Sequence, residues 1–244
     1  MQYYDIHTHH PPIHQDITAI VSVDVRNPVL PEMGVYSVGI HPRNTAWSAT
    51  GYDSRLNQSV TMQSPLDESL PLHEDFFRLQ EMAKLPNVVA IGETGLDKLA
   101  ATPLDQQTAQ FITHIELAEK YHKPLIIHCV KAWQELIAIR KQFTSPIPWI
   151  IHGFRGNGQL ARQMLHSGFS LSFGLHFHPD ALRTAWESHS LYAETDDLPI
   201  SIKDVYHRIA SLLPITHDAL SLEIDENFLN WRVPLRTQLT TINS

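Results

Sequence analysis

The sequence predicts an α/β fold, a (β/α)8 TIM barrel. Three observations predict it. Short runs rich in Val, Ile and Leu recur along the 244 residues, and several are continuous, as in parallel strands that are buried on both faces. Helical patterns lie between the later runs, as the crossovers of a parallel sheet require. Side chains able to bind metal ions lie near the ends of these runs, where a barrel gathers its functional residues.

Eight apolar or β-rich runs are predicted to be the strands of the barrel. In chain order they are Tyr3–Ile6, Ile17–Val23, Val35–Ile40, Val88–Gly92, Leu125–Ile127, Pro148–Ile151, Phe169–Ser172 and Leu191–Ala193. We expect a parallel arrangement, because segments with a different, helical periodicity separate the later runs.

Six segments carry apolar residues at the spacing of an amphipathic helix. They are His73–Lys84, Leu104–His122, Ala132–Phe143, Gly158–Ser167, Asp180–Glu187 and Ile202–Leu213. The first two connections differ, because the residues between Val23 and Val35 are too few and too rich in proline for a full helix. We expect loops or a turn of helix there, so the barrel is irregular in its first two crossovers.

Residues 1–231 are predicted to form a single barrel domain, and residues 232–244 a polar C-terminal tail. Residues 44–72 are rich in polar side chains and read as a long loop over the mouth of the barrel. The first residues lack the basic and apolar segments of a signal peptide, and no apolar run is long enough to cross a bilayer. We therefore expect a cytoplasmic protein without membrane association.

The single cysteine, Cys129, cannot form an internal disulfide, which fits a reducing compartment. It should point to the opposite side of its strand from His128, because side chains alternate. We therefore expect a small buried residue rather than a metal ligand. The formal net charge is −8, so the chain lacks the excess of Lys and Arg of a general nucleic-acid binder.

Residues with metal-binding side chains lie near the ends of successive runs, and they are the main indication of function. The set is His7, His9, Glu93, His128, His152 and Asp196. His7 and His9 are two apart in an extended segment, so their imidazoles point to the same side. A lone histidine after a strand is commonly a hydrogen-bonded core residue, but this set needs a shared cause. It predicts a metal centre at the mouth of the barrel.

The nitrogen and oxygen donors of this set are enough for two divalent ions, with Zn, Mn, Mg, Fe or Ni as candidates. One ion would be held by His7, His9, Glu93 and Asp196, and the other by Glu93, His128 and His152. Glu93 has two oxygens and can bridge the ions, the arrangement used for phosphoester hydrolysis. We predict Glu93 and Asp196 as catalytic residues, with Asp196 accepting a proton from the attacking water.

The motifs that carry these residues resemble those of the TatD family of metal-dependent hydrolases, in the amidohydrolase-like group of TIM barrels. They are Asp-Ile-His-Thr-His at 5–9, Gly-Ile-His-Pro at 39–42, Gly-Glu-Thr-Gly-Leu-Asp at 92–97, Pro124 through His128 and Cys129, His-Gly-Phe at 152–154, Glu-Thr-Asp at 194–196 and Glu-Asn-Phe at 226–228. The resemblance implies a two-metal barrel similar to TatD-type deoxyribonucleases. It implies a small phosphoester, a nucleotide or a DNA end as the substrate, and supports the same ligands.

The chain departs from the family pattern around the predicted substrate site. Val130 stands where the family commonly has Arg after His-Cys, so a bidentate phosphate contact is lost. We hypothesise that Arg155, three residues after His152, supplies the missing charge; a solvated loop residue is the alternative. Lys98 and Arg43 are weaker candidates. In Gly-Ile-His-Pro, His41 is predicted to face the substrate.

Two other functions stay open from the sequence alone. Related barrels hydrolyse amide or lactone bonds, although their sites often carry a carbamylated lysine where this chain has Glu93. The second open function is that of a barrel that binds metal without catalysis. Retention of every predicted ligand argues against it, since each ligand side chain is costly to bury without metal. His176 and His178 form a second His-x-His. We expect no metal-ligand role for them because the predicted shell is full, and an additional substrate contact is the alternative.

Overall fold

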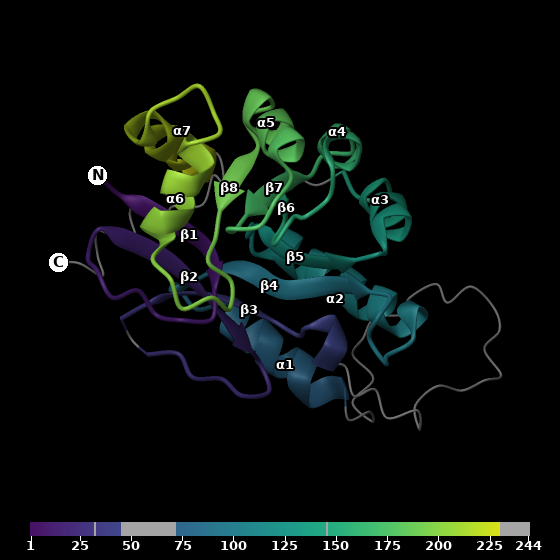
Figure 1. Cartoon of the computed structure of the whole chain (residues 1–244). Coiled ribbons are helices and arrows are strands. Elements are labelled where there is room, and N and C mark those ends of the chain that lie inside the picture. The colour runs from purple at the N-terminus through teal and green to yellow at the C-terminus, as the bar shows by residue number, and fades with distance from the viewer. Residues whose placement is uncertain (32, 45–71, 145, 230–244) are drawn as a thin grey trace.

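The computed structural model describes residues 1–31, 33–44, 72–144 and 146–229. They form the predicted (β/α)8 barrel, with eight strands paired in the order β1 to β8 (Figure 1). All neighbouring strands are parallel. The strands are β1 (Tyr3–Thr8), β2 (Ile17–Asp24), β3 (Val35–Gly39), β4 (Val88–Asp97), β5 (Leu125–Val130), β6 (Trp149–Ile151), β7 (Ser170–Phe173) and β8 (Leu191–Ala193).

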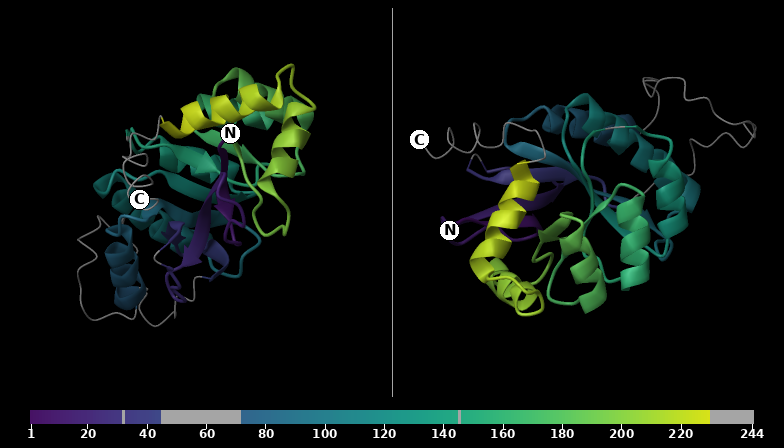
Figure 2. Two further views of the ribbon diagram at one scale, coloured as in Figure 1. Left: turned by 90° about the vertical axis from the view of Figure 1, so that its left-hand side faces the viewer. Right: turned by 90° about the horizontal axis from the view of Figure 1, so that it is seen from above.

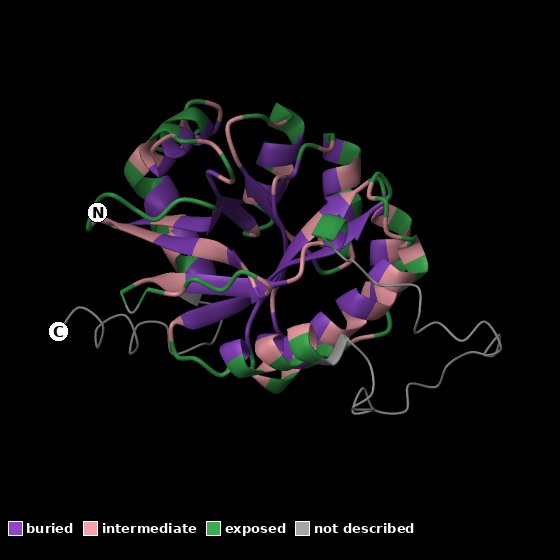
Figure 3. Cartoon of the chain, turned by 90° about the horizontal axis from the view of Figure 1, so that it is seen from below, coloured by how far each residue is buried: buried purple, intermediate pink, exposed green. Residues whose placement is uncertain are grey.

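Helices cover the outside of the strands, as the view from above shows (Figure 2). They are α1 (Leu72–Ala83), α2 (Leu104–Lys120), α3 (Trp133–Arg140), α4 (Gly158–His166), α5 (Pro179–Glu187), α6 (Ile202–Ala210) and α7 (His217–Leu229). A short 3-10 helix, η1 (Pro42–Asn44), follows β3. Buried residues lie along the strands and the inward helix faces, and exposed residues lie on the outward faces (Figure 3). This division follows from the amphipathic patterns in the sequence.

The first two crossovers are irregular, as predicted. Among the described residues, no helix lies between β1 and β2 or between β2 and β3. The predicted loop at 44–72 and the predicted tail at 232–244 fall almost entirely outside the described residues, as does the domain boundary at 231. None of the helices described here has the length and apolar character needed to span a bilayer.

Strand β4 is longer than the predicted Val88–Gly92 and continues to Asp97. Glu93 therefore lies within a strand rather than after its end. Gly95, with a φ of 138°, adopts a backbone conformation that side chains with a Cβ rarely allow. A Cβ at Gly95 would lie 2.1 Å from the carbonyl oxygen of His128. Glycine thus lets β4 approach β5 closely beside two predicted site residues.

The helix ends differ from the prediction at several places. The predicted helices Leu104–His122, Ala132–Phe143 and Ile202–Leu213 are shorter than expected, ending at Lys120, Arg140 and Ala210. In the first, His122 has a φ of 52°, which a helix cannot continue through. Helix α7 is absent from the sequence prediction, although its buried Leu220, Ile224 and Phe228 follow the helical period.

The barrel closes between β1 and β8 through a short parallel bridge from Thr8 to Asp196. The backbone N–H of Asp196 donates to the carbonyl of His7 at 3.0 Å, and that of His9 donates to the carbonyl of Asp196 at 3.0 Å. This closure brings the first strand next to the residues that follow the last strand, and it places three of the predicted ligands side by side.

Candidate metal centre

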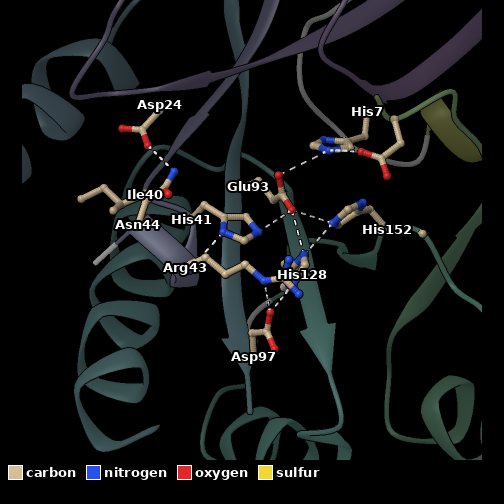
Figure 4. Close-up of polar contacts among 12 residues, drawn as sticks. His7, Asp24, Ile40, His41, Arg43, Asn44, Glu93, Asp97, His128 and His152 are labelled. Atoms are coloured by element: carbon tan, nitrogen blue, oxygen red, sulfur yellow. Dashed lines mark hydrogen bonds and ion pairs between the residues drawn. The ribbon is translucent and has the colours of Figure 1, made fainter. Parts of the chain in front are cut away.

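Glu93 lies at the centre of a cluster of histidines from strands on both sides of it (Figure 4). Its Oε2 faces the β1–β8 closure, 3.5 Å from Nε2 of His7 and 3.8 Å from Nε2 of His9. Oδ1 of Asp196 lies 3.5 and 3.7 Å from the same two nitrogens. Two ligands of one tetrahedral ion, each at about 2.1 Å from it, are about 3.4 Å apart. The four side chains are therefore spaced as donors around a single cation would be.

His7 supplies a further indication that this space suits a cation. The residue is fully buried, and neither of its ring nitrogens has a hydrogen-bond partner within the part of the chain that the structure describes. A buried imidazole left without partners is costly. Coordination by Nε2 of His7 would remove that cost at the atom which faces Glu93 and Asp196.

Oε1 of Glu93 faces a second group, formed by His128 and His152. Nδ1 of His128 and Nε2 of His152 lie 2.9 and 2.8 Å from it, and the two nitrogens are 3.3 Å apart. The two oxygens of one carboxylate are thus shared between two sets of donors. The centre therefore has the form that a bridging carboxylate requires.

A carboxylate lies behind each histidine of this second group. Oδ2 of Asp97 is 3.4 Å from Nε2 of His128, and Oε1 of Glu194 is 3.5 Å from Nδ1 of His152. Asp97 and Glu194 are both fully buried. A carboxylate on the outer ring nitrogen holds the proton there and leaves the inner nitrogen's lone pair free for a metal. Neither carboxylate has this role in the sequence prediction.

His41 lies in the same cluster but fits a donor rather than a ligand. The backbone N–H of Arg43 donates to its Nδ1 at 3.0 Å, so Nδ1 is deprotonated and the proton of the neutral ring is on Nε2. That nitrogen lies 3.1 Å from Oε1 of Glu93. Although His41, Glu93 and His128 are close enough to share an ion, this tautomer makes His41 a hydrogen-bond donor.

The ionisation states of the cluster agree with metal binding. Burial opposes ionisation of Glu93, but the contacts with His152, His128 and His41 outweigh it and hold the pKa below the usual range. Burial also opposes ionisation of Asp196, yet His7 and His152 keep its pKa at about 2. Burial lowers the pKa of His9 and His128, against the pull of Glu93. Anionic carboxylates and neutral imidazoles are what ligation requires.

His152 differs from the other histidines of the cluster. Although burial alone would lower its pKa, Glu93 and Glu194 on its two sides raise it well above the ordinary value. In the metal-free protein this imidazolium offsets the charge of Glu93. A cation at the same place would displace its proton.

The other cationic residues predicted for substrate binding line a different hollow or pair elsewhere. Arg155 is exposed and lines a hollow of about 20 Å³ with His176 and Asp196. Lys98 pairs with Glu135 of α3 at 2.6 Å. A larger hollow of about 250 Å³ opens beside the cluster. The sequence did not predict that residues of β2 line it. Its lining is His9, Ser22, Val23, Asp24, Gly39, His41, Asn44 and Glu93.

Cys129 lies outside the cluster, as expected from strand alternation. It is a free, buried cysteine, and burial raises the pKa of its thiol to about 12. A thiol that stays protonated at neutral pH is a poor metal ligand.

Comparison with known proteins supports the motifs. A 3'-5' ssDNA/RNA exonuclease TatD of Rahnella sp. (strain Y9602) is 37% identical over 95 residues, 38% of this chain and 36% of the relative. The uncharacterized metal-dependent hydrolase YabD of Bacillus subtilis (strain 168) is 35% identical over 112 residues, 45% of this chain and 44% of the relative. The matches thus span less than half of these relatives.

The fold and the family are supported over a longer stretch. The structure of YJJV, a TatD homologue from Escherichia coli K12, aligns with a TM-score of 0.70 and 19% identity, over 94% of this chain and 97% of that one. A TatD family hydrolase from Entamoeba histolytica aligns with a TM-score of 0.67 and 18% identity, over 96% of this chain and 98% of that one. At such identity the likeness concerns the fold. The profile of TatD-related DNases matches residues 22–231, and the chain belongs to this family.

Proposed function

We propose that this protein is a hydrolase of phosphoester bonds that works with two divalent cations. The observation that carries the proposal is the orientation of Glu93, whose Oε2 and Oε1 face separate sets of donors. One cation would be held by His7, His9, Glu93 and Asp196, and the other by Glu93, His128 and His152. This set of nitrogen and oxygen donors suits Zn²⁺, Mn²⁺, Mg²⁺, Fe²⁺ or Ni²⁺.

When bound, two cations in such a site lower the pKa of water and offset the charge of the reacting phosphoryl group. Asp196 is ionised, and 30% of its side chain is exposed. It orients the attacking water and accepts its proton. His41 holds Oε1 of Glu93 through its Nε2–H and faces the substrate from the wall of the hollow beside the cluster. Arg155, across a hollow from His176, contacts the substrate beyond the reacting group.

The substrate that we propose is the end of a short nucleic-acid strand, a nucleotide or a small phosphodiester. The name of the Rahnella relative, an exonuclease of single-stranded DNA and RNA, supports this class. The formal net charge of −8 disfavours long, non-specific binding to nucleic acid. We also propose a cytoplasmic location, on the ground of the free thiol of Cys129.

Two alternatives are separated by the same experiment. An amide or lactone hydrolase would turn over those substrates and leave phosphodiesters intact. A barrel that only binds metal would hold the cations without turnover of either class. The carboxylate at the centre favours phosphoester chemistry, because the related amide and lactone hydrolases often use a carbamylated lysine there.

The test begins with metal analysis of the purified protein, followed by a screen of bis(p-nitrophenyl) phosphate and 3'-labelled oligonucleotides with each metal. We expect turnover that stops with a chelator and returns with the metal. Asp196→Asn and His128→Ala should lower kcat about 100-fold or more and keep the unfolding temperature. Asp218→Asn and His166→Ala are matched controls on exposed side chains, and they should leave kcat unchanged.

Near-normal kcat in Asp196→Asn or His128→Ala would rule out this mechanism. Absence of phosphoester turnover with every metal would rule out the proposed function itself. In that case turnover of an amide or lactone panel would identify the first alternative, and metal binding without any turnover the second.

A further inference from the structure

Arg43 is a cation at the mouth of the barrel whose side chain is held by a buried carboxylate. Its Nε donates to Oδ2 of Asp97 at 2.5 Å, and its side chain crosses beneath His41 toward His128 (Figure 4). The same Oδ2 lies 3.4 Å from Nε2 of His128. One carboxylate oxygen therefore fixes both a predicted metal ligand and a guanidinium next to it.

Asp97 is itself fixed in position by burial and by hydrogen bonds. It is fully buried, and its Oδ1 accepts the backbone N–H of Leu99 at 2.8 Å. Gln107 of α2 clasps its backbone, accepting from its N–H at 2.7 Å and donating to its carbonyl at 3.0 Å. Its register partner on β5 is the apolar Val130. Arg43 is thus the only guanidinium that contacts Asp97 among the described residues.

The rest of the Arg43 side chain faces outward. Its side chain is 55% exposed while that of Asp97 is 0% exposed. Only Nε takes part in the contact with Asp97, and within the described residues Nη1 and Nη2 have no hydrogen-bond partner. A guanidinium held by one edge presents its other edge to a planar or tetrahedral oxyanion.

Two other arginines of the mouth lack this combination. Arg26 binds Asp24 through Nε and Nη2 at 3.0 and 2.7 Å, and its Nη1 donates to the carbonyl of Asn44, so its donors are used. Arg155 is exposed, and no hydrogen bond of its side chain occurs within the described residues. Fixing such a side chain on a ligand costs conformational entropy. Within the described part of the chain, Arg43 alone of the three is both fixed by a carboxylate and left with Nη donors that have no partner.

We propose that Arg43 is the phosphate-binding cation of this site, with Asp97 as the residue that positions it beside His128. Nη1 and Nη2 bind the non-bridging oxygens of the substrate phosphoryl group. The inference rests on the proposed function for its substrate class. It adds an anion subsite in which Arg43 of η1, held by Asp97 of β4, supplies the cation that β5 lacks at Val130.

The test measures binding of inorganic phosphate to the metal-loaded protein by calorimetry, together with kcat and KM on bis(p-nitrophenyl) phosphate. Arg43→Gln should weaken phosphate binding and lower kcat/KM about 10- to 100-fold, with unchanged metal content. Arg43→Lys keeps the charge opposite Asp97 but loses the fork, so it should keep the unfolding temperature and still bind phosphate about tenfold more weakly. Arg78→Gln, which removes an arginine paired with Glu74 on α1, is the matched control.

A merely structural role for Arg43 makes a different prediction. If Arg43 served only to neutralise Asp97, the double variant Arg43→Gln/Asp97→Asn, titrated at a metal concentration that metal analysis shows to saturate it, would recover phosphate affinity, since no buried charge is left unpaired. The anion subsite predicts that the double variant stays as weak as Arg43→Gln. Should Arg43→Gln fail to fold, Arg43→Lys and the double variant carry the same comparison.

The outcomes separate this inference from the proposed function. Phosphate affinity within twofold of wild type in Arg43→Gln or Arg43→Lys, or recovery in the double variant, overturns the role of Arg43, whatever the wild-type turnover. Loss of affinity in the Arg43 variants of a protein that hydrolyses no phosphoester would keep the anion subsite and overturn the proposed reaction.

Discussion

At the scale of single residues, the histidines of the centre depend on the acids behind them. Asp97 holds the outer nitrogen of His128, and Glu194 lies against that of His152. Glu194 also accepts the backbone N–H of Gly153 at 2.6 Å, which fixes its carboxylate. The inner ring nitrogens are thereby aimed at Glu93. Metal affinity should therefore depend on residues that never touch the metal.

Glu194→Gln tests this dependence. The amide keeps the size of the side chain but removes the charge that holds the proton on Nδ1 of His152. We expect metal affinity to fall about 10- to 100-fold with the fold unchanged, measured by calorimetric titration of the metal-free protein. Glu187→Gln, at the exposed end of α5, is the control, and equal affinities in the two variants would remove Glu194 from the account.

The six residues that the sequence singles out lie close together in the structure, whereas nothing in the sequence pattern placed Asp97 and Glu194 behind them. Periodicity indicates which side of a strand a residue is on, and it therefore grouped His7 with His9. It does not indicate which side chain of the next strand lies within hydrogen-bond distance. Asp97 and Glu194 acquire their roles from the register of β4 with β5 and from the loop after β6.

At the scale of elements, α2 fixes the ends of β3 and β4 through one polar stripe. Gln107 clasps the backbone of Asp97, and Gln110 donates to the carbonyl of Ile40 at 2.7 Å. Nε2 of His114 accepts the N–H of Ile40 at 3.1 Å, and its Nδ1 donates to the carbonyl of Gln110 at 2.8 Å. These contacts fix the direction in which the chain leaves β3, and so the positions of His41 and of Arg43 in η1. The sequence predicted the helix from its apolar residues and gave no signal for this stripe.

His114 should make stability depend on pH in a defined window. Burial lowers the pKa of His114 from 6.5 to about 4, so the unfolded chain binds a proton that the folded protein resists. This contribution is fully present above pH 6.5 and is lost as the pH falls toward 4. We expect a loss of about 3 kcal/mol from this residue. Urea unfolding of wild type and His114→Gln, compared at pH 8 and pH 4.5, measures it.

In that comparison the amide of His114→Gln cannot titrate. Its free energy of unfolding should change less between the two pH values than that of wild type, with pH 8 as the common reference. Parallel losses in the two proteins would assign the pH dependence to other groups.

At the scale of the whole molecule, the barrel was predictable because its strands are buried on both faces and its later crossovers are helical. The extension of β4 was not, since Gly92 to Gly95 reads as a break, and only the packing against β5 shows that it continues. Closure of the barrel joins His7 and His9 at the end of β1 to Asp196 after β8. A cation there would tie the first strand to the last.

Metal binding should therefore stabilise the entire fold. Because only the folded chain gathers the donors, saturating Mn²⁺ or Zn²⁺ should raise the unfolding temperature by about 5 to 10 °C, measured by calorimetry. Glu93→Gln should lose most of this rise, while Glu81→Gln on the exposed face of α1 should keep it. An equal rise in Glu93→Gln would show that the cations bind elsewhere.

The central claim is that Glu93 divides its two oxygens between two cations. The most direct measurement is a crystal structure of the Mn²⁺-loaded protein with an anomalous difference map. The account predicts two peaks about 3.5 to 4 Å apart, one near His7, His9 and Asp196 and one near His128 and His152. A single peak, or peaks away from Glu93, would contradict it.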